Sequence, residues 1–213
     1  MIVTKSLEFS YDNNFIFKFP NINLKSTENL LILGNSGIGK STLLHNLAGI
    51  LRPKSGTINI FNNDISEFSE YELDKFRGEN IGIIFQKPHF VNSLTVGENL
   101  ELAQFLGRNK RGDIKLTLES LKILDKLNKK PKELSHGEKQ RVSIAIAIIN
   151  SPKLILADEP TSSLDDSNCA NVINILKEQA LKYAAQLVVI THDSRLKKHF
   201  KNSLDLWAFL NLV

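Results

Sequence analysis

Alternating hydrophobic and polar positions mark the first part of the chain as β-structure. The stretch "SLEFSY" alternates, and "FIFKFP" and "NINL" follow it after polar turns. The run "NLLILG" (29–34) is almost entirely apolar, as expected of a strand buried on both faces. A helix, "KSTLLHNLAGIL", follows, and a further strand is predicted at "NIGIIFQ" after a short helix in "SEFSEYELDKF".

From about 91 to 149 the apolar residues instead recur at intervals of three and four, which is typical of amphipathic helices. Strands return at "LILAD" and "QLVVIT", separated by a helix, and the tail "SLDLWAFLNLV" is expected at the edge of the fold. This order predicts an α/β fold with a mainly parallel sheet, an N-terminal antiparallel β part and an inserted helical lobe. We assign 1–90 and 150–213 to the core of a single domain, 1–213, and about 91–149 to the lobe.

The composition is that of an ordinary globular chain, with 42% hydrophobic and 23% charged residues. Apolar runs such as "VSIAIAII" are shorter than the roughly 18 residues that a membrane span needs, and the N-terminus predicts no secretory signal. The net charge of +4 suits an anionic ligand but is too small to indicate a nucleic-acid partner, so none is expected. The single cysteine, Cys169, excludes an internal disulfide and fits a reducing cytosol.

The stretch "GNSGIGKST" (34–42) fits the phosphate-binding pattern G-x-x-x-x-G-K-[ST], between a predicted strand and a predicted helix. Its glycines let the backbone N–H groups point at phosphate oxygens, Lys40 brings a cation to the β- and γ-phosphates, and the Ser41 hydroxyl can bind Mg²⁺. The fold class is therefore that of a P-loop NTPase. The predicted phosphate-binding residues are Gly34, Asn35, Ser36, Gly37, Ile38, Gly39, Lys40, Ser41 and Thr42.

Two acids follow the buried strand in "LILADE" and are candidates for the reaction chemistry. Asp158, at the end of the strand, is placed to bind Mg²⁺, and Glu159 is placed to act as general base toward a water molecule. His192 in "THD" ends another strand and is a candidate to hydrogen bond the γ-phosphate.

A P-loop also occurs in small GTPases and nucleotide kinases. A GTPase requires an Asn/Thr-Lys-x-Asp sequence after a late strand to read guanine. The nearest match, "NKKP" (128–131), lacks the acid and follows a helix, which argues against a GTPase.

These motifs together resemble those of the ATP-binding-cassette ATPases, over essentially the whole chain and in the same order. Tyr11 matches the residue that stacks on adenine, and Gln86 matches the Q-loop glutamine, which the resemblance implies takes part in magnesium binding and catalysis. The other matches are 34–42 with Walker A, "LSHGE" (134–138) with the signature motif, "LILADE" with Walker B, "SSLD" (162–165) with the D-loop, and His192 with the switch histidine.

The resemblance implies that two such cassettes, as a homodimer or with a close paralogue, pack head to tail around ATP and Mg²⁺. Ser135, Gly137 and Glu138 would then face the nucleotide held by the partner cassette. The signature departs from the commonest form, LSGGQ, because His136 replaces a glycine and Glu138 a glutamine. His136 is expected to cost some backbone freedom while leaving the contact residues in place.

The subgroup that the chain resembles most is the lipoprotein-release and macrolide-export type. This implies an integral membrane permease as partner, and a position on the cytoplasmic, inner face of the cell membrane. Candidates to line a permease groove beside Gln86 are Phe85, Pro88, Phe90 and Val91. The alternative is an ATP-gated regulatory or mechanical module that controls a membrane partner without moving a solute. The DNA-repair branch is disfavoured, since the chain has neither coiled-coil heptads nor cysteine pairs.

Overall fold

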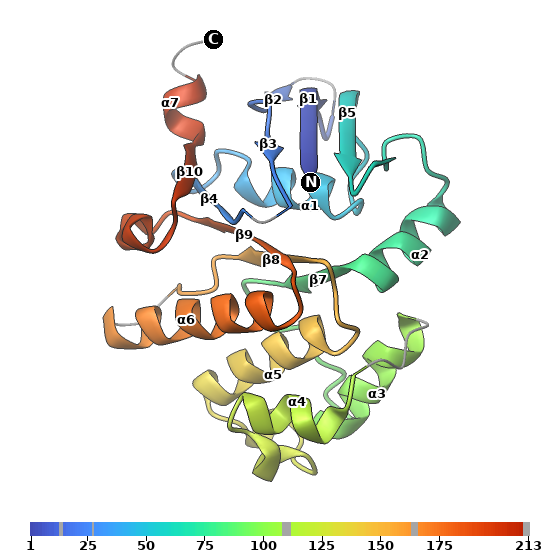
Figure 1. The fold of residues 1–213 in the computed structure, drawn as a ribbon, viewed down its shortest axis with the longest axis vertical. Coiled ribbons are helices and arrows are strands. Elements are labelled where there is room, and N and C mark those ends of the chain that lie inside the picture. Colours follow the sequence, from blue (N-terminus) through green and yellow to red (C-terminus); the bar gives the residue numbers. More distant parts are fainter. Residues whose placement is uncertain (13–14, 27, 108–111, 163–165, 211–213) are drawn as a thin grey trace.

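A computed structural model describes residues 1–12, 15–26, 28–107, 112–162 and 166–210. It contains an antiparallel sheet, a parallel sheet and a group of helices stacked along the long axis (Figure 1). In the antiparallel sheet, β1 pairs with β2, β3 and β5, and β5 pairs with β6. The bounds of these strands are Ile2–Phe9 for β1, Phe17–Lys18 for β2, Asn23–Leu24 for β3, Ser55–Ile60 for β5 and Asn63–Asp64 for β6.

The second sheet has the strand order β10-β4-β9-β8-β7, and every neighbouring pair is parallel. Its strands are β4 (Leu30–Leu33), β7 (Ile81–Ile84), β8 (Leu154–Asp158), β9 (Gln186–Thr191) and β10 (Asn202–Asp205). The carboxyl ends of parallel strands share one edge of a sheet, which is where α/β proteins bind ligands. The phosphate loop, the acids after "LILA" and His192 all follow these ends.

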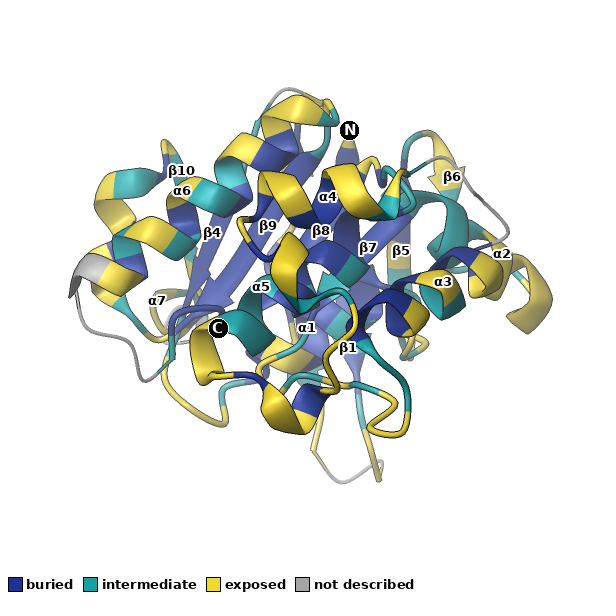
Figure 2. Cartoon of the chain, turned by 90° about the horizontal axis from the view of Figure 1, so that it is seen from below, coloured by how far each residue is buried: buried dark blue, intermediate teal, exposed yellow. Residues whose placement is uncertain are grey.

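Each face of the parallel sheet contributes to a different hydrophobic core. Along β4, Leu31 and Leu33 pack into a cluster with α5 and α6, whereas Leu30 and Ile32 pack into a cluster with α1 and the antiparallel sheet. Burial on both faces explains why these strands are continuous hydrophobic runs. Figure 2 shows the strands as dark blue, buried ribbons behind the helices that cover them.

The helices divide into those around the sheets and those of a separate group below them. The helical lobe, which here means α3, η1, η2, α4 and α5, lies at the lower end of the molecule (Figure 1). Its bounds are Val96–Leu106 for α3, Ile114–Ser120 for α4, Leu124–Lys126 for η1, Pro131–Glu133 for η2 and His136–Ile148 for α5. The other helices are α1 (Lys40–Leu47), α2 (Glu70–Asn80), α6 (Asp166–Lys182), η3 (Ser194–His199) and α7 (Leu206–Leu210).

Three helices begin with the same hydrogen-bonding motif, formed by a serine or threonine and a glutamate three residues later. Ser69, Thr95 and Ser135 are the N-caps of α2, α3 and α5, and each accepts a hydrogen bond from the backbone of a glutamate three residues on. The glutamate side chain in turn accepts from the N-cap backbone, which completes a capping box. The signature motif therefore coincides with the start of a well-capped helix.

The predicted fold class is confirmed, with differences in the shortest elements. The strands expected in "FIFKFP" and "NINL" shrink to two residues each, β2 and β3. The tail does reach the sheet edge, where β10 pairs in parallel with β4, but it then turns into α7 instead of continuing to alternate. None of the helices in the described part of the chain is long and apolar enough to cross a membrane.

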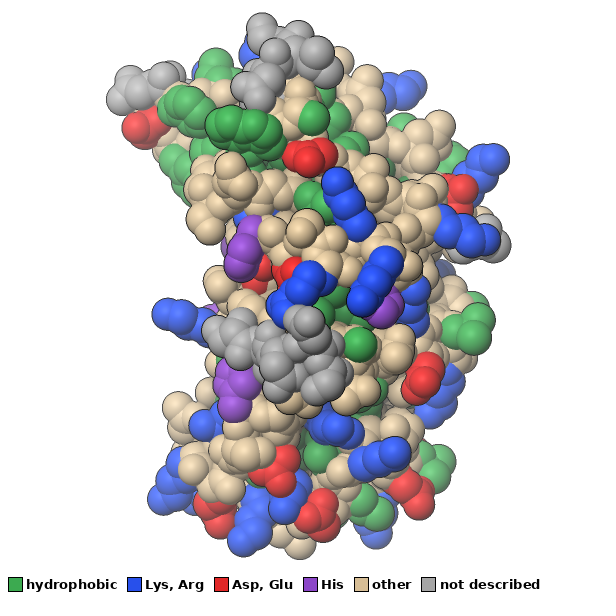
Figure 3. Space-filling model, turned by 90° about the vertical axis from the view of Figure 1, so that its left-hand side faces the viewer, with side chains coloured by type: hydrophobic (Ala, Val, Ile, Leu, Met, Phe, Trp, Pro, Cys, Tyr) green, Lys and Arg blue, Asp and Glu red, His purple; other side chains and the backbone are tan. Residues whose placement is uncertain are grey.

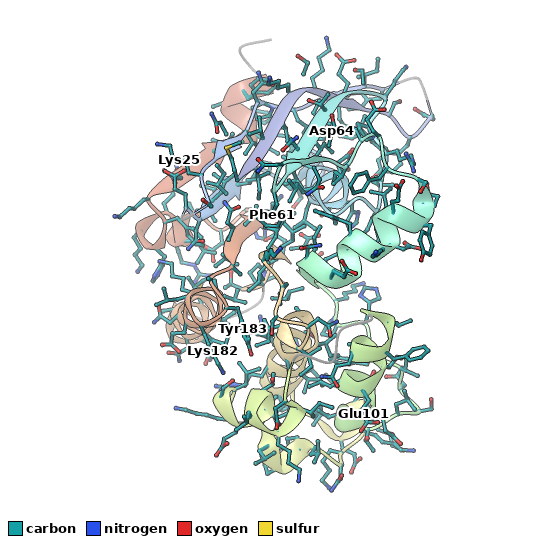
Figure 4. All side chains as sticks on the ribbon, turned by 45° about the vertical axis from the view of Figure 1, so that its right-hand side comes forward. Lys25, Phe61, Asp64, Glu101, Lys182 and Tyr183 are labelled. Carbon is teal, nitrogen blue, oxygen red and sulfur yellow. The ribbon has the colours of Figure 1, made fainter. Side chains whose placement is uncertain are left out.

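The molecular surface mixes charges of both signs. On the face shown in Figure 3, Lys/Arg and Asp/Glu side chains are interspersed at the lower end, and hydrophobic side chains gather near the top. Figure 4 shows Glu101 on the outer side of α3, and Lys182 and Tyr183 at the end of α6, well away from the carboxyl edge of the sheet.

Candidate functional site

The phosphate loop leaves β4 at Gly34 and enters α1 at Lys40. Gly37 and Gly39 have φ angles of 81° and 99°, a left-handed region that favours glycine. At Gly39 a side chain is also excluded by space, since an added Cβ would lie 2.7 Å from Cδ1 of Phe17. The helix start that follows is therefore free to present its N–H groups to an anion.

Lys40 is buried, and its ammonium group lies inside the loop. Nζ donates to the carbonyl oxygens of Gly34 and Asn35, at 2.9 and 3.0 Å, and lies 3.3 Å from Oε1 of Glu159. The predicted phosphate-binding lysine and the predicted general base are thus ion-paired with each other. A nucleotide phosphate would compete with this carboxylate for the lysine.

Glu159 is buried, and hydrogen bonds occupy both of its carboxylate oxygens. Oε2 accepts from the Thr191 hydroxyl at 2.7 Å and lies 3.0 Å from Nδ1 of His192, whose backbone N–H points at both oxygens. Burial is the largest influence on the pKa of Glu159 and raises it, but the bonds from His192 and Thr191 and the charge of Lys40 outweigh burial. The pKa is lowered overall, so the group is a carboxylate at neutral pH, as a general base must be.

The backbone of Glu159 is itself unusual, with φ at 47°. Residues held in this region are common at functional sites, where the surrounding structure maintains them. Two contacts do so here: the Glu159 N–H donates to the carbonyl of Ile190 at 2.9 Å, and the Gln140 side chain from α5 donates to the carbonyl of Pro160. The acid is therefore anchored from both β9 and the helical lobe.

Asp158 and Ser41 meet at the predicted magnesium position. The Ser41 hydroxyl hydrogen bonds the Asp158 carboxylate, whose Oδ1 is buried without a hydrogen-bond partner. Burial, followed by the charge of Glu159, raises the pKa of Asp158 above its usual value. A buried carboxylate oxygen lacking a partner, beside a hydroxyl, fits a hard cation, and Mg²⁺ commonly uses only one or two carboxylates together with phosphates and water. Such a cation would neutralise charge that develops on the phosphates during hydrolysis.

The predicted adenine-binding residue lies next to the phosphate loop. The Tyr11 hydroxyl is 3.0 Å from Oγ1 of Thr42, which fixes the ring beside the start of α1 while leaving the side chain 65% exposed. The ring makes edge contacts with Phe9 and Phe17, at centroid distances of 4.7 and 6.2 Å. A rigid, exposed aromatic ring in this position is suited to stacking against a base.

Gln86 is exposed at the end of β7, near the other reacting groups. It lines a small cavity with Glu159, Pro160 and His136, so Gln86 and the signature residue His136 meet beside Glu159. Phe85 and Pro88 line the same cavity, whereas Phe90 packs against the lobe core. The predicted D-loop, 162–165, lies outside the described residues apart from Ser162.

The signature residues Ser135, Gly137 and Glu138 occupy a separate position. They begin α5 in the helical lobe, where Ser135 and Gly137 are exposed and Glu138 is half-buried. Ser135 and Glu138 hydrogen bond each other, and Glu138 pairs with Lys126 and not with the phosphate loop of the same chain. The structure therefore brings together Lys40, Ser41, Asp158, Glu159 and His192, and leaves Ser135 and Gly137 as a second, exposed group.

Sequence reasoning missed several residues of this arrangement. Thr191 is the buried hydroxyl that holds Glu159, and Gln140 anchors the following peptide. The signal that could have identified Thr191 is its position, because it is a polar residue at the end of the apolar run "LVVI". Lys126 carries no motif, and its contact with Glu138 follows only from the fold.

The family profile of the ABC transporters matches residues 17–162. The chain is 39% identical over 183 residues to the lipoprotein-releasing system ATP-binding protein LolD of Shewanella frigidimarina, covering 84% of this chain and 77% of that protein. It is 32% identical to LolD of Wigglesworthia glossinidia brevipalpis, covering 96% and 91%.

Solved structures show the same likeness. The dimeric ATP-binding cassette MJ0796 in a post-hydrolysis state bound to ADP and Pi superposes with a TM-score of 0.84 at 32% identity, covering 96% of this chain and 94% of that chain. The cassette cbiO1 of Clostridium perfringens, part of an ABC transporter complex, gives a TM-score of 0.83 at 29% identity, covering 96% and 83%. The chain thus belongs to the ABC transporter family, as an ATPase of the lipoprotein-release type.

Proposed function

We propose that this ATPase drives a membrane permease of the lipoprotein-release type by closing as a dimer around two ATP molecules. The observation that carries the proposal is the separation of its two phosphate-recognition groups. The phosphate loop holds Lys40 in the core, while Ser135 begins α5 in the lobe, where it is exposed and its hydroxyl hydrogen bonds Glu138. Two copies arranged head to tail give each signature a nucleotide, and a similar cassette is dimeric with ADP and Pi.

The chemistry follows from the contacts around Glu159. A γ-phosphate entering the loop attracts Lys40 away from the carboxylate, which leaves Oε1 free to accept a proton from water. Thr191 keeps Oε2 in place during this exchange, at 2.7 Å. His192, with its exposed ring beside the same carboxylate, is positioned to hydrogen bond the γ-phosphate. Lys40 and the backbone N–H groups of the loop then stabilise the charge on the transferred phosphoryl group.

The permease site is best supported by a large cavity between the core and the lobe. Its volume is about 790 Å³, and α2, β7, α3 and α5 line it. Its apolar lining includes Ile81, Ile83 and Ile146, together with Phe105 and Leu106, which are 75% and 67% exposed. Charged residues of α2, Asp74, Lys75 and Arg77, line it as well. Exposed apolar residues gathered at a groove are typical of sites that receive an amphipathic helix.

This cavity differs from the groove expected beside Gln86. The cavity next to Phe85 and Pro88 has a volume of only about 20 Å³. One turn of an α-helix, about 5.4 Å long and about 10 Å across with its side chains, occupies on the order of 400 Å³. Ile146 adds its apolar side chain to the lining of the larger cavity.

Phe105→Asp is expected to weaken co-purification of the membrane permease by at least about tenfold, because one charge placed in a desolvated apolar contact costs more than 1.4 kcal/mol or so. The matched control is Leu181→Asp, at an 84% exposed leucine on α6 far from the cavity. ATP turnover of the isolated chain is the folding control for both. Equal retention of the permease by the two variants would contradict this docking site.

Tyr11→Ala is expected to raise the dissociation constant for ATP by about 5- to 150-fold, since stacking of a base on an aromatic ring is worth about 1–3 kcal/mol. Tyr11→Phe keeps the ring and removes only the hydroxyl that contacts Thr42, so its effect is expected to be several-fold smaller. Equilibrium titration with nucleotide measures both. An affinity of Tyr11→Ala equal to that of the parent would show that another residue holds the base.

The test of the whole proposal is purification of the native complex from membranes, followed by identification of the co-purifying subunit and assay of lipid-modified protein release. A permease whose release activity depends on ATP supports the proposal. A membrane regulator or cell-wall enzyme that moves no solute would replace it with an ATP-gated control module.

A further inference from the structure

Lys126 is a half-buried neighbour of the signature motif, although it belongs to none of the motifs identified in the sequence. It ends η1, and its ammonium group reaches across the lobe to the start of α5. Nζ lies 3.1 Å from Oε1 of Glu138 and 2.8 Å from Oδ2 of Asp125. Both Lys126 and Glu138 have 28% exposed side chains, so this pair is partly shielded from water.

Glu138 in turn determines the hydrogen bonding of Ser135. Its Oε2 accepts from both the backbone N–H and the hydroxyl of Ser135, each at 2.8 Å, while its own N–H donates to the Ser135 oxygen at 3.3 Å. The one hydroxyl proton of Ser135 is thus directed at the carboxylate. These bonds and Lys126 lower the pKa of Glu138 to about 2, so the carboxylate is ionised at any physiological pH.

A full negative charge beside Ser135 opposes the approach of a second anion. In the proposed dimer, Ser135 must face the γ-phosphate of the partner cassette, a few ångströms from Glu138. A glutamine at this position would carry no charge, but the chain has a glutamate, and repulsion between like charges at short range weakens binding. Lys126 is the cation that directly contacts this carboxylate among the described residues.

We propose that Lys126 is a positioning residue of the composite nucleotide site: it neutralises Glu138 and fixes its orientation, so that Ser135 can receive the partner's γ-phosphate. The inference rests on the proposed ATP-dependent dimer. Lys126 should therefore affect association of the two cassettes. It should not affect nucleotide binding by one chain, because the residues proposed for that binding, Lys40 and Tyr11, lie in the core and not in the lobe.

The experiment replaces Lys126 in two backgrounds, the native chain and Glu138→Gln. Turnover is measured as a function of protein concentration, and ATP-dependent dimers are measured by sedimentation after adding Glu159→Gln. We expect Lys126→Met to raise the protein concentration that gives half-maximal turnover about tenfold, because the dimer contains two such sites and each contributes a factor of about three. Lys126→Arg keeps the positive charge and should return this concentration to the parent value. In the Glu138→Gln background the same change should alter it less than about twofold, because no charge remains to neutralise.

The matched control is Lys129→Met in the same lobe. Lys129 pairs with Glu133 at 3.3 Å, a more exposed contact, with side chains 52% and 40% exposed, that involves no signature residue. Nucleotide affinity of the monomer and the thermal midpoint should be unchanged in every Lys126 variant, which separates positioning from folding. An equal effect of Lys126→Met in both backgrounds, or no effect in the native one, would overturn the role proposed for Lys126 and leave the dimer proposal standing. If the parent forms no dimer with ATP, the dimer proposal fails and this role fails with it.

Discussion

Glu159→Gln is expected to reduce ATP turnover by about 100- to 10,000-fold, the range that general-base catalysis contributes. The amide has the shape of the carboxylate. With its one oxygen in the position of Oε2 it can still accept from the Thr191 hydroxyl and the His192 backbone N–H, but it cannot take a proton from water. It also lacks the charge that holds Lys40 at 3.3 Å in the nucleotide-free chain. Lys40 then meets the phosphates without a competitor, so ATP affinity should be equal or higher.

The measurement combines steady-state turnover, nucleotide titration and sedimentation with ATP, where the variant should accumulate as a dimer. Glu178→Gln, at an exposed glutamate on α6, is the control for the same chemical change outside the site. Turnover of Glu159→Gln within about threefold of the parent would rule out Glu159 as the base, because such a loss is far below a general-base contribution.

Ser135→Arg is expected to abolish measurable turnover and leave ATP binding by the monomer intact. The bulky side chain would occupy the space into which the partner's γ-phosphate must fit, while the phosphate loop and Tyr11 of the same chain are untouched. The change also removes the N-cap of α5, which costs roughly 1 kcal/mol of stability, and this loss must be separated from the functional one.

Ser69→Arg provides that separation. Ser69 caps α2 through the same capping box, with its hydroxyl 2.7 Å from Oε2 of Glu72, so its loss imposes a similar folding cost away from the signature. We expect Ser69→Arg to keep most of the turnover of the isolated chain. Loss of nucleotide binding in Ser135→Arg itself would instead mean that this serine serves its own nucleotide.

Local spacing was sufficient to predict the parts of the site that are continuous in sequence. The loop 34–42 and the pair Asp158 and Glu159 follow buried strands directly, so their placement at the sheet edge depends only on the strands being parallel. The capping box at Ser135 is also a local pattern. Fold class and elements could be predicted for the same reason, because buried strands and amphipathic helices have different periods.

The remaining features depend on contacts between distant segments. Nothing near Lys40 in the sequence indicates that it pairs with Glu159, and nothing near Lys126 indicates that it reaches Glu138. The large cavity needs α2, β7, α3 and α5 in one arrangement, which no single stretch encodes. The tail shows a different limit, since its weak alternation favoured an extended chain and the structure has α7. A short helix at a chain end depends on what it packs against, here Leu206 beside Gly34.

The hydrophobic cluster beneath the sheet has a consequence for how the molecule can be divided. It joins Leu100 and Leu118 of the helical lobe to Ile155 and Ala157 of β8, the strand that ends at Asp158 and precedes Glu159. A fragment comprising only the lobe would expose to solvent the hydrophobic side chains that pack against β8. A core lacking the lobe would expose the side chains of β8 that face the lobe. Modular swapping of lobes between cassettes should therefore exchange β8 side chains as well.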